Sequence, residues 1–214
     1  MNRKSNSNEY ELLQRRIETL KENFGFHQSS LIMQNPAEEL TPKHEDMLRG
    51  LILLCHAEFE NYFESVAIKL IDNAELVFNN SDITDNNLIS LSKKAINELR
   101  EIIKGNNGIK KDSIKKMFTP LGYSISDDFD GLLITDLDSF GTKRGAIAHT
   151  STIGTNRQLD KMSTMSTIRK ILDAIEDFEN VIKSKAPLFF ETPISELDLD
   201  TNSNESTLEV SLNS

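Results

Sequence analysis

Residues 143–150, Lys-Arg-Gly-Ala-Ile-Ala-His-Thr, hold the side chains of this chain that are best suited to chemistry. Arg144 is a fixed cation that can bind phosphate through two hydrogen bonds, and His149 can transfer protons near neutral pH. Cleavage of an RNA backbone needs a base for the 2′-hydroxyl, a cation for the phosphorane charge and an acid for the leaving 5′-oxygen. Arg144 and His149 could therefore take part in RNA cleavage without a metal.

The spacing of Arg144 and His149 bears on whether one chain could complete such a site. Five residues of regular helix turn the side-chain direction by about 140°, so the two residues do not share a helix face. Either the helix has ended by His149, as the sequence Thr-Ser-Thr-Ile-Gly at 150–154 allows, or another surface completes the site. From the residues alone, the alternative is an arginine in a salt bridge and a histidine that caps a helix, without catalysis.

A symmetric partner would supply the missing surface. One chain offers only one evident proton transfer, whereas two copies at a two-fold axis would double the arginines and imidazoles in one cleft. The small residues Gly145, Ala146 and Ala148 would permit close approach of the two copies. We therefore expect a homodimer in which Arg144 and His149 of both chains line a shared cleft.

Apolar residues recur at helical spacing along most of the chain and predict an all-α fold, an up-and-down bundle of about five or six helices. The predicted helices cover residues 8–24, 41–78, 86–104, 111–118, 135–148 and 158–183, and residues 121–133 are expected to form a loop. Thr41-Pro42 is a typical helix start, because threonine can cap the helix and proline fits its first turn. Only 9 glycines and 5 prolines occur, which also favours helices over a turn-rich β fold.

The chain divides into three parts by composition. We expect an N-terminal helix and loop at 1–40 that pack on the bundle, a helical domain at 41–185, and an acidic, loosely ordered tail at 186–214. No basic residue follows Lys185, and Pro187 and Pro193 oppose a stable helix. The apolar residues 188–190, Leu-Phe-Phe, could hold the start of the tail against the body.

The net charge of −10 argues against a general nucleic-acid coat protein but leaves room for a local phosphate site. One region is basic, with eight lysines and arginines against three acidic residues between 93 and 116. It predicts either solvated helix faces or a surface that follows an RNA backbone. Its basic residues are Lys93, Lys94, Arg100, Lys104, Lys110, Lys111, Lys115 and Lys116.

Several kinds of site are not expected. Cys55, the only cysteine, lies in an apolar run, which predicts a buried thiol and excludes an internal disulfide. The four histidines lack metal-ligand spacing, so we expect no metal and no cofactor. No stretch is long and apolar enough to span a bilayer, and the N-terminus lacks a secretory leader pattern. These features predict a cytoplasmic protein without a membrane partner.

Three segments resemble the HEPN superfamily. Residues 137–149, Leu-Asp-Ser-Phe-Gly-Thr-Lys-Arg-Gly-Ala-Ile-Ala-His, resemble its signature, an arginine followed after four to six residues by a histidine. Residues 54–63, Leu-Cys-His-Ala-Glu-Phe-Glu-Asn-Tyr-Phe, are similar to its acidic–aromatic helix, and residues 114–122, Ile-Lys-Lys-Met-Phe-Thr-Pro-Leu-Gly, to the piece before the signature in the RiboL-PSP-HEPN group. The resemblance covers about residues 40–185 and implies a HEPN-type bundle that dimerises with its two signatures facing.

The resemblance also implies a metal-independent endoribonuclease, often in a toxin–antitoxin or phage-defence setting. The implied partners are an RNA substrate, a second copy, and an antitoxin or defence-system protein. Arg144 and His149 carry over as catalytic residues, and Glu60 carries over as a carboxylate that orients Arg144. His56 shares a helix face with Glu60 and is a further supporting candidate, the alternative being a surface or interfacial pair. The residues expected to contact RNA are Lys143, Lys110, Lys111, Lys115 and Lys116.

Gly145 departs from the superfamily pattern, which commonly has a polar residue, often Asn, directly after the arginine. The departure removes a hydrogen-bonding group from the expected site. It motivates a second hypothesis, a non-catalytic dimerisation module or an RNA- or protein-binding module of the HEPN type.

Overall fold

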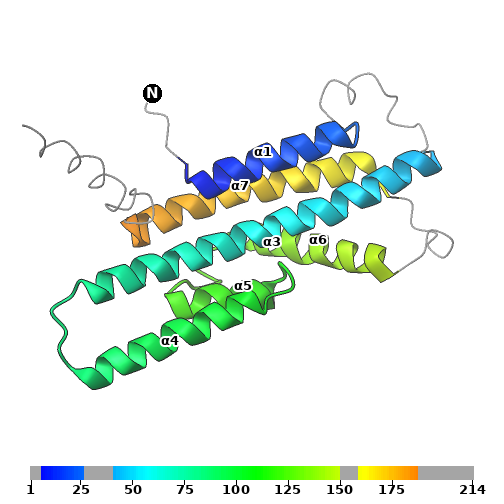
Figure 1. Ribbon diagram of the computed structural model, residues 1–214. Helices are drawn as coiled ribbons and strands as arrows, with labels where there is room; N and C mark the ends of the chain where they lie inside the picture. The colour runs from blue at the N-terminus through cyan, green and yellow to red at the C-terminus, as the bar shows by residue number, and fades with distance from the viewer. Residues whose placement is uncertain (1–5, 27–40, 150–158, 188–214) are drawn as a thin grey trace, which may run out of the picture.

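The computed structural model describes residues 6–26, 41–149 and 159–187 (Figure 1). They form six α-helices and one 3₁₀ turn, without a strand among the described residues, so the predicted all-α bundle is confirmed. The helices are α1 (Asn8–Asn23), α3 (Pro42–Asn79), α4 (Asn86–Lys104), α5 (Lys111–Phe118), α6 (Gly131–His149) and α7 (Lys161–Lys185), and the 3₁₀ turn is η1 (Thr119–Leu121). Most of the acidic tail lies outside these ranges. No helix of the described residues is long and apolar enough to cross a membrane.

Helix α3 is the spine of the molecule (Figure 1). Its 38 residues give a rod about 57 Å long at 1.5 Å per residue. The Thr41 hydroxyl accepts from the His44 backbone N–H at 3.4 Å, and Pro42 occupies the first turn, as the sequence predicted. α1 and α7 lie along one side of this rod and α5 and α6 along another, while α4 folds back beside its C-terminal half.

Helix α6 begins at Gly131, four residues earlier than the sequence predicted, and takes in the end of the predicted loop at 121–133. Asp130 explains the difference, because its side chain accepts from the Leu132 backbone N–H at 3.0 Å and its carbonyl accepts from Ile134. A side chain that satisfies a free N–H in the first turn stabilises the start of a helix. The cap therefore lengthens α6 toward its N-terminus, while its other end, His149, lies one residue beyond the predicted end.

One aromatic contact joins two of the helices that carry the candidate site, α3 and α6. Phe59 of α3 and Phe140 of α6 meet edge to face, with ring centroids 5.7 Å apart. Both rings are fully buried, and such pairs contribute about 0.5–1.5 kcal/mol beyond the burial of their area. Because Glu60 and Gly141 directly follow these residues, the contact holds the corresponding parts of α3 and α6 together.

A buried carboxylate joins three helices at the other side of α3. Glu179 of α7 is 1 % exposed and accepts from the Ser7 backbone N–H at 2.9 Å, the Ser7 hydroxyl at 2.8 Å and the Tyr62 hydroxyl at 2.7 Å. Ser7 also caps α1 through the Tyr10 N–H. Three donors compensate a carboxylate for the loss of water, so this group ties the start of α1 to α3 and α7.

Helix α4 is the most weakly buried of the long helices. Ile103 is its only buried residue, while Leu88, Leu91 and Ile102 remain exposed. Arg100 binds it to α3 through ion pairs with Asp72 and Glu75. This part of the basic region is therefore engaged in holding α4 on α3, and Lys93, Lys94 and Lys104 are exposed.

Candidate functional site

The structure brings four of the predicted site residues into one neighbourhood between α3, α5 and α6. His56 and Glu60 lie one turn apart on α3, Lys110 lies at the start of α5, and Arg144 lies on α6. The charges of Arg144 and Lys110 act on His56, and the charge of Arg144 also acts on Glu60. We call these four residues the Arg144 cluster.

His56 is buried, with 3 % of its surface exposed, which excludes an exposed surface pair with Glu60 within this chain. Its Nδ1 atom lies 3.9 Å from Glu60 Oε2, too far for a hydrogen bond. Burial is the main cause that lowers the pKa of His56 to about 4, and the positive charges of Arg144 and Lys110 contribute to the same shift. His56 is therefore a neutral imidazole at physiological pH.

Glu60 is the carboxylate of the cluster. Burial and the nearby charge of Glu64 raise its pKa, and Arg144 opposes this shift. Its Oε1 atom is buried without a hydrogen-bond partner among the described residues. A carboxylate oxygen with an unfilled acceptor is available to an arginine or to a polar group of a ligand.

Gly141 allows the cluster to assemble. A Cβ atom at this position would lie 3.1 Å from Lys110 Cγ, 3.4 Å from Lys110 Cε and 3.8 Å from His56 Nε2. The stem of Lys110 thus crosses the backbone of α6 where a side chain would stand. Asp138, one turn before Gly141, accepts from the Lys111 backbone N–H at 2.6 Å and so binds the start of α5 to α6.

Gly141 and Asp138 had no role in the sequence prediction. A glycine inside a helical pattern is a signal for close approach of another group, and it would have pointed to this contact. Nothing in the sequence alone identified Lys110 as the group that approaches, because the two residues lie on different elements.

Arg144 and His149 both belong to α6, and His149 is its last residue. The side chain of His149 lies outside the described part of the structure. Since the helix continues to His149, regular geometry directs the two residues about 140° apart. No described carboxylate forms an ion pair with Arg144, so the alternative of a salt-bridged arginine finds no partner in this part of the chain.

The other predicted RNA-contacting lysines differ in their surroundings. Lys143 is half-buried, and its ammonium group lies 3.4 Å from the Thr164 hydroxyl of α7. Lys111, Lys115 and Lys116 are exposed on α5, whose buried residues are Ile114, Met117 and Phe118. The structure thus brings Lys110 to the cluster and leaves Lys115 and Lys116 farther along α5.

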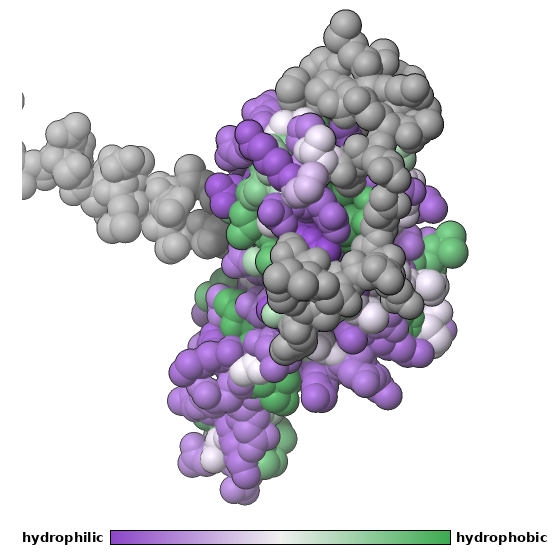
Figure 2. Space-filling model, turned by 90° about the vertical axis from the view of Figure 1, so that its right-hand side faces the viewer, coloured by the Kyte–Doolittle hydropathy of each residue, from purple (hydrophilic) through white to green (hydrophobic). Residues whose placement is uncertain are grey.

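The end of the molecule at which α6 terminates faces the viewer in Figure 2. Outside the grey segments this face is mainly hydrophilic, and its hydrophobic residues form separate patches.

Comparison with known proteins identifies the same family that the sequence motifs resemble. The family model described as RiboL-PSP-HEPN matches residues 11–184. No curated protein and no solved structure gives a match. The family match takes in the whole Arg144 cluster and all six described helices apart from their outermost residues, and it spans well over half of the 214 residues. The chain therefore belongs to the RiboL-PSP-HEPN family.

Proposed function

We propose that this protein is a metal-independent endoribonuclease that cuts RNA by attack of a 2′-hydroxyl on the adjacent phosphorus. The observation that carries the proposal is the Arg144 cluster. An arginine without a described ion-pair partner lies beside a buried neutral imidazole and a carboxylate, on the same helix as His149. Membership of a HEPN family supports the same activity.

In the proposed reaction the 2′-oxygen forms a bond to phosphorus and the bond from phosphorus to the 5′-oxygen breaks. The products are a 2′,3′-cyclic phosphate and a free 5′-hydroxyl. Arg144 binds the phosphate and stabilises the negative charge of the phosphorane. His149, the last residue of α6, transfers a proton to the leaving oxygen.

Glu60 and His56 act as positioning residues in this proposal. Glu60 orients Arg144 through its charge. Its Oε1 atom has no hydrogen-bond partner among the described residues and can accept from the guanidinium group. His56 lies beside Gly141. Because it is uncharged, it does not compete with Arg144 for the negative charge of Glu60. Lys110 contributes a second positive charge at the edge of the cluster for the RNA backbone.

The second proton transfer requires a further group, and we propose that a second copy of the chain supplies it. Arg144 and His149 diverge on α6, so a two-fold axis near the end of this helix would bring two sets together. We further propose that the enzyme serves as a toxin or a phage-defence effector, with an antitoxin or defence-system protein as partner. These roles rest on the family to which the chain belongs.

The activity is tested by incubation of the purified protein with RNA in EDTA, followed by analysis of the fragment ends. We expect fragments with 2′,3′-cyclic phosphate ends, and their loss in both Arg144→Ala and His149→Ala. Arg169→Ala is the matched control, because Arg169 is an exposed arginine on α7 whose only described ion pair is with Asp173 at 3.8 Å. Cleavage retained in both site variants would contradict the proposal.

The dimer is tested by light scattering at micromolar concentration. A protein that is only monomeric, with cleavage that stays linear in protein concentration, would contradict a shared site. Gly145 favours a second candidate function, RNA or protein binding by a dimer without catalysis. RNA binding without any fragments in EDTA, by a protein that is dimeric, would support that function instead.

A further inference from the structure

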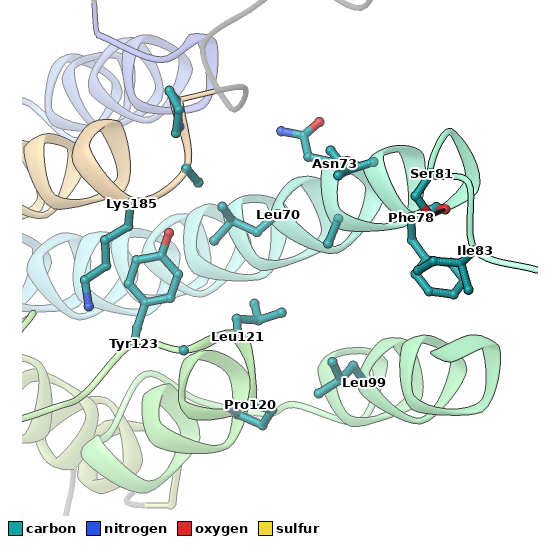
Figure 3. A pocket seen from close by; sticks show the side chains of 15 residues that line it. Leu70, Asn73, Phe78, Ser81, Ile83, Leu99, Pro120, Leu121, Tyr123 and Lys185 are labelled. Carbon is teal, nitrogen blue, oxygen red and sulfur yellow. Dashed lines mark hydrogen bonds between the residues drawn. The ribbon is translucent and has the colours of Figure 1, made fainter. Parts of the chain in front are cut away.

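A groove of about 920 Å³ lies beside the C-terminal half of α3 (Figure 3). Leu70 and Val77 of α3, Leu99 of α4, Leu121 of η1 and Pro187 after α7 contribute to its walls. Leu70, the lining residue of α3 nearest to Glu60, follows it by ten residues, which corresponds to about 15 Å along the axis. The groove is therefore separate from the Arg144 cluster.

The groove holds one buried polar group without a partner. Asn73 Nδ2 is buried and makes no hydrogen bond with any residue that the structure describes. In Figure 3 Asn73 projects from α3 on the side where α7 ends beyond Lys185. A buried amide N–H₂ without an acceptor is unfavourable, so its presence indicates that another group accepts from it. The surrounding walls are apolar, which fits a ligand that combines apolar side chains with a backbone carbonyl.

We propose that the groove binds residues 188–190 of the same chain, Leu-Phe-Phe. Pro187, the last described residue, itself lines the groove, so the next residue begins within its reach. These three residues are the longest uninterrupted apolar run after Lys185. Leucine and phenylalanine side chains gain most from leaving water, and their backbone carbonyls are the acceptors that Asn73 lacks.

The tether favours this occupant over a separate partner. A segment that is covalently attached at the edge of a groove has a high effective concentration there, so modest contacts suffice to hold it. Pro187 and Pro193 bracket the run and oppose a helix, which leaves its carbonyl groups free to accept. The acidic residues that follow would then leave the groove toward solvent.

A single tryptophan tests the proposal in the full chain, because the natural sequence contains none. In Phe189→Trp we expect blue-shifted emission and weak quenching by acrylamide, as for a buried indole. Val77→Glu in this background should shift the emission to the red and raise the quenching, because Val77 lines the groove. Ala74→Glu, at an exposed groove position, is a second groove variant with the same expected result.

Leu76→Glu is the matched control, because Leu76 adjoins Val77 in sequence but does not line the groove. The two side chains are similarly exposed, 52 % for Leu76 and 51 % for Val77. Leu76→Glu should leave the emission unchanged, and circular dichroism should show that all variants keep their helices. Emission of an exposed indole in Phe189→Trp would overturn the proposal, as would an equal response to Val77→Glu and Leu76→Glu. A blue shift that depends on protein concentration would also overturn it, in favour of a second copy as occupant. Neither readout depends on RNA cleavage.

Discussion

His56 Nε2 lies 3.8 Å from the place that a Cβ atom on Gly141 would occupy, and Lys110 passes still closer to that place. The absence of one side chain on α6 thus lets a residue of α3 and a residue of α5 meet beside Arg144. The two glycines of the signature segment therefore differ in the space around them. A Cβ atom on Gly141 would be crowded by Lys110, whereas one on Gly145 would have nothing within 4 Å.

The different space at Gly141 and Gly145 predicts that alanine substitutions there have different effects on stability. Replacement of a glycine inside a helix by alanine normally stabilises by about 0.5–1 kcal/mol. We expect Gly145→Ala to show this gain, and Gly141→Ala to show less or none because Lys110 must move. Urea unfolding of both variants measures the difference, and equal gains would contradict the crowded contact at Gly141.

The charge of Arg144 predicts a change in the titration of His56. Burial is the largest cause of the low pKa of His56 and Arg144 is the next, so Arg144→Gln should raise that pKa above about 4 without restoring 6.5. Lys143→Gln is the matched control, since its ammonium group lies near Thr164 of α7. NMR titration of the imidazole gives both values. An unchanged pKa in Arg144→Gln would show that the two groups do not interact.

The same shift predicts how the free energy of unfolding depends on pH. The unfolded chain binds a proton at His56 below about pH 6.5, whereas the folded chain does so only near pH 4. The free energy of unfolding should therefore fall as the pH drops from 6.5 to 4, and His56 should account for up to about 3 kcal/mol of this fall. Above pH 6.5 the protonation of His56 should have no effect on the free energy of unfolding. His56→Gln should lack this part of the pH dependence. Parallel curves for the two proteins in urea would contradict the buried neutral imidazole.

Gly145→Asn is expected to increase RNA cleavage. It supplies the polar group that commonly follows the arginine in the superfamily, and the open space around Gly145 accepts a side chain without repacking. Gly145→Ala separates the effect of the amide from that of a stiffer helix. If the asparagine variant cleaves RNA no faster than the alanine variant, the residue after the arginine does not limit the reaction.

The helices were predictable because their signals are local. Thr41 and Pro42 set the start of α3, and its apolar positions recur within a few residues of one another. The start of α6 was not predicted, because Asp127, Asp128 and Asp130 could each cap a helix. Their sequence positions do not show that Asp130 is the residue that does so.

The site was less predictable, because its geometry joins distant parts of the chain. Glu60, His56 and Arg144 were candidates from sequence motifs alone, but the contact at Gly141 depends on Lys110 lying across α6. Arg100 was grouped with the basic region, yet it is held by Asp72 and Glu75 of α3. Such pairings depend on tertiary packing, which the spacing of residues along the chain does not specify.

The buried carboxylate of Glu179 sets a limit on how far the chain can be shortened at its start. Two of its three donors come from Ser7, so removal of the first seven residues would leave Glu179 in the core with Tyr62 alone. The loss of donors to a buried charge typically costs about 1–3 kcal/mol or more. A tag fused before Ser7 preserves these bonds, whereas a chain that starts at Asn8 should unfold at a lower temperature.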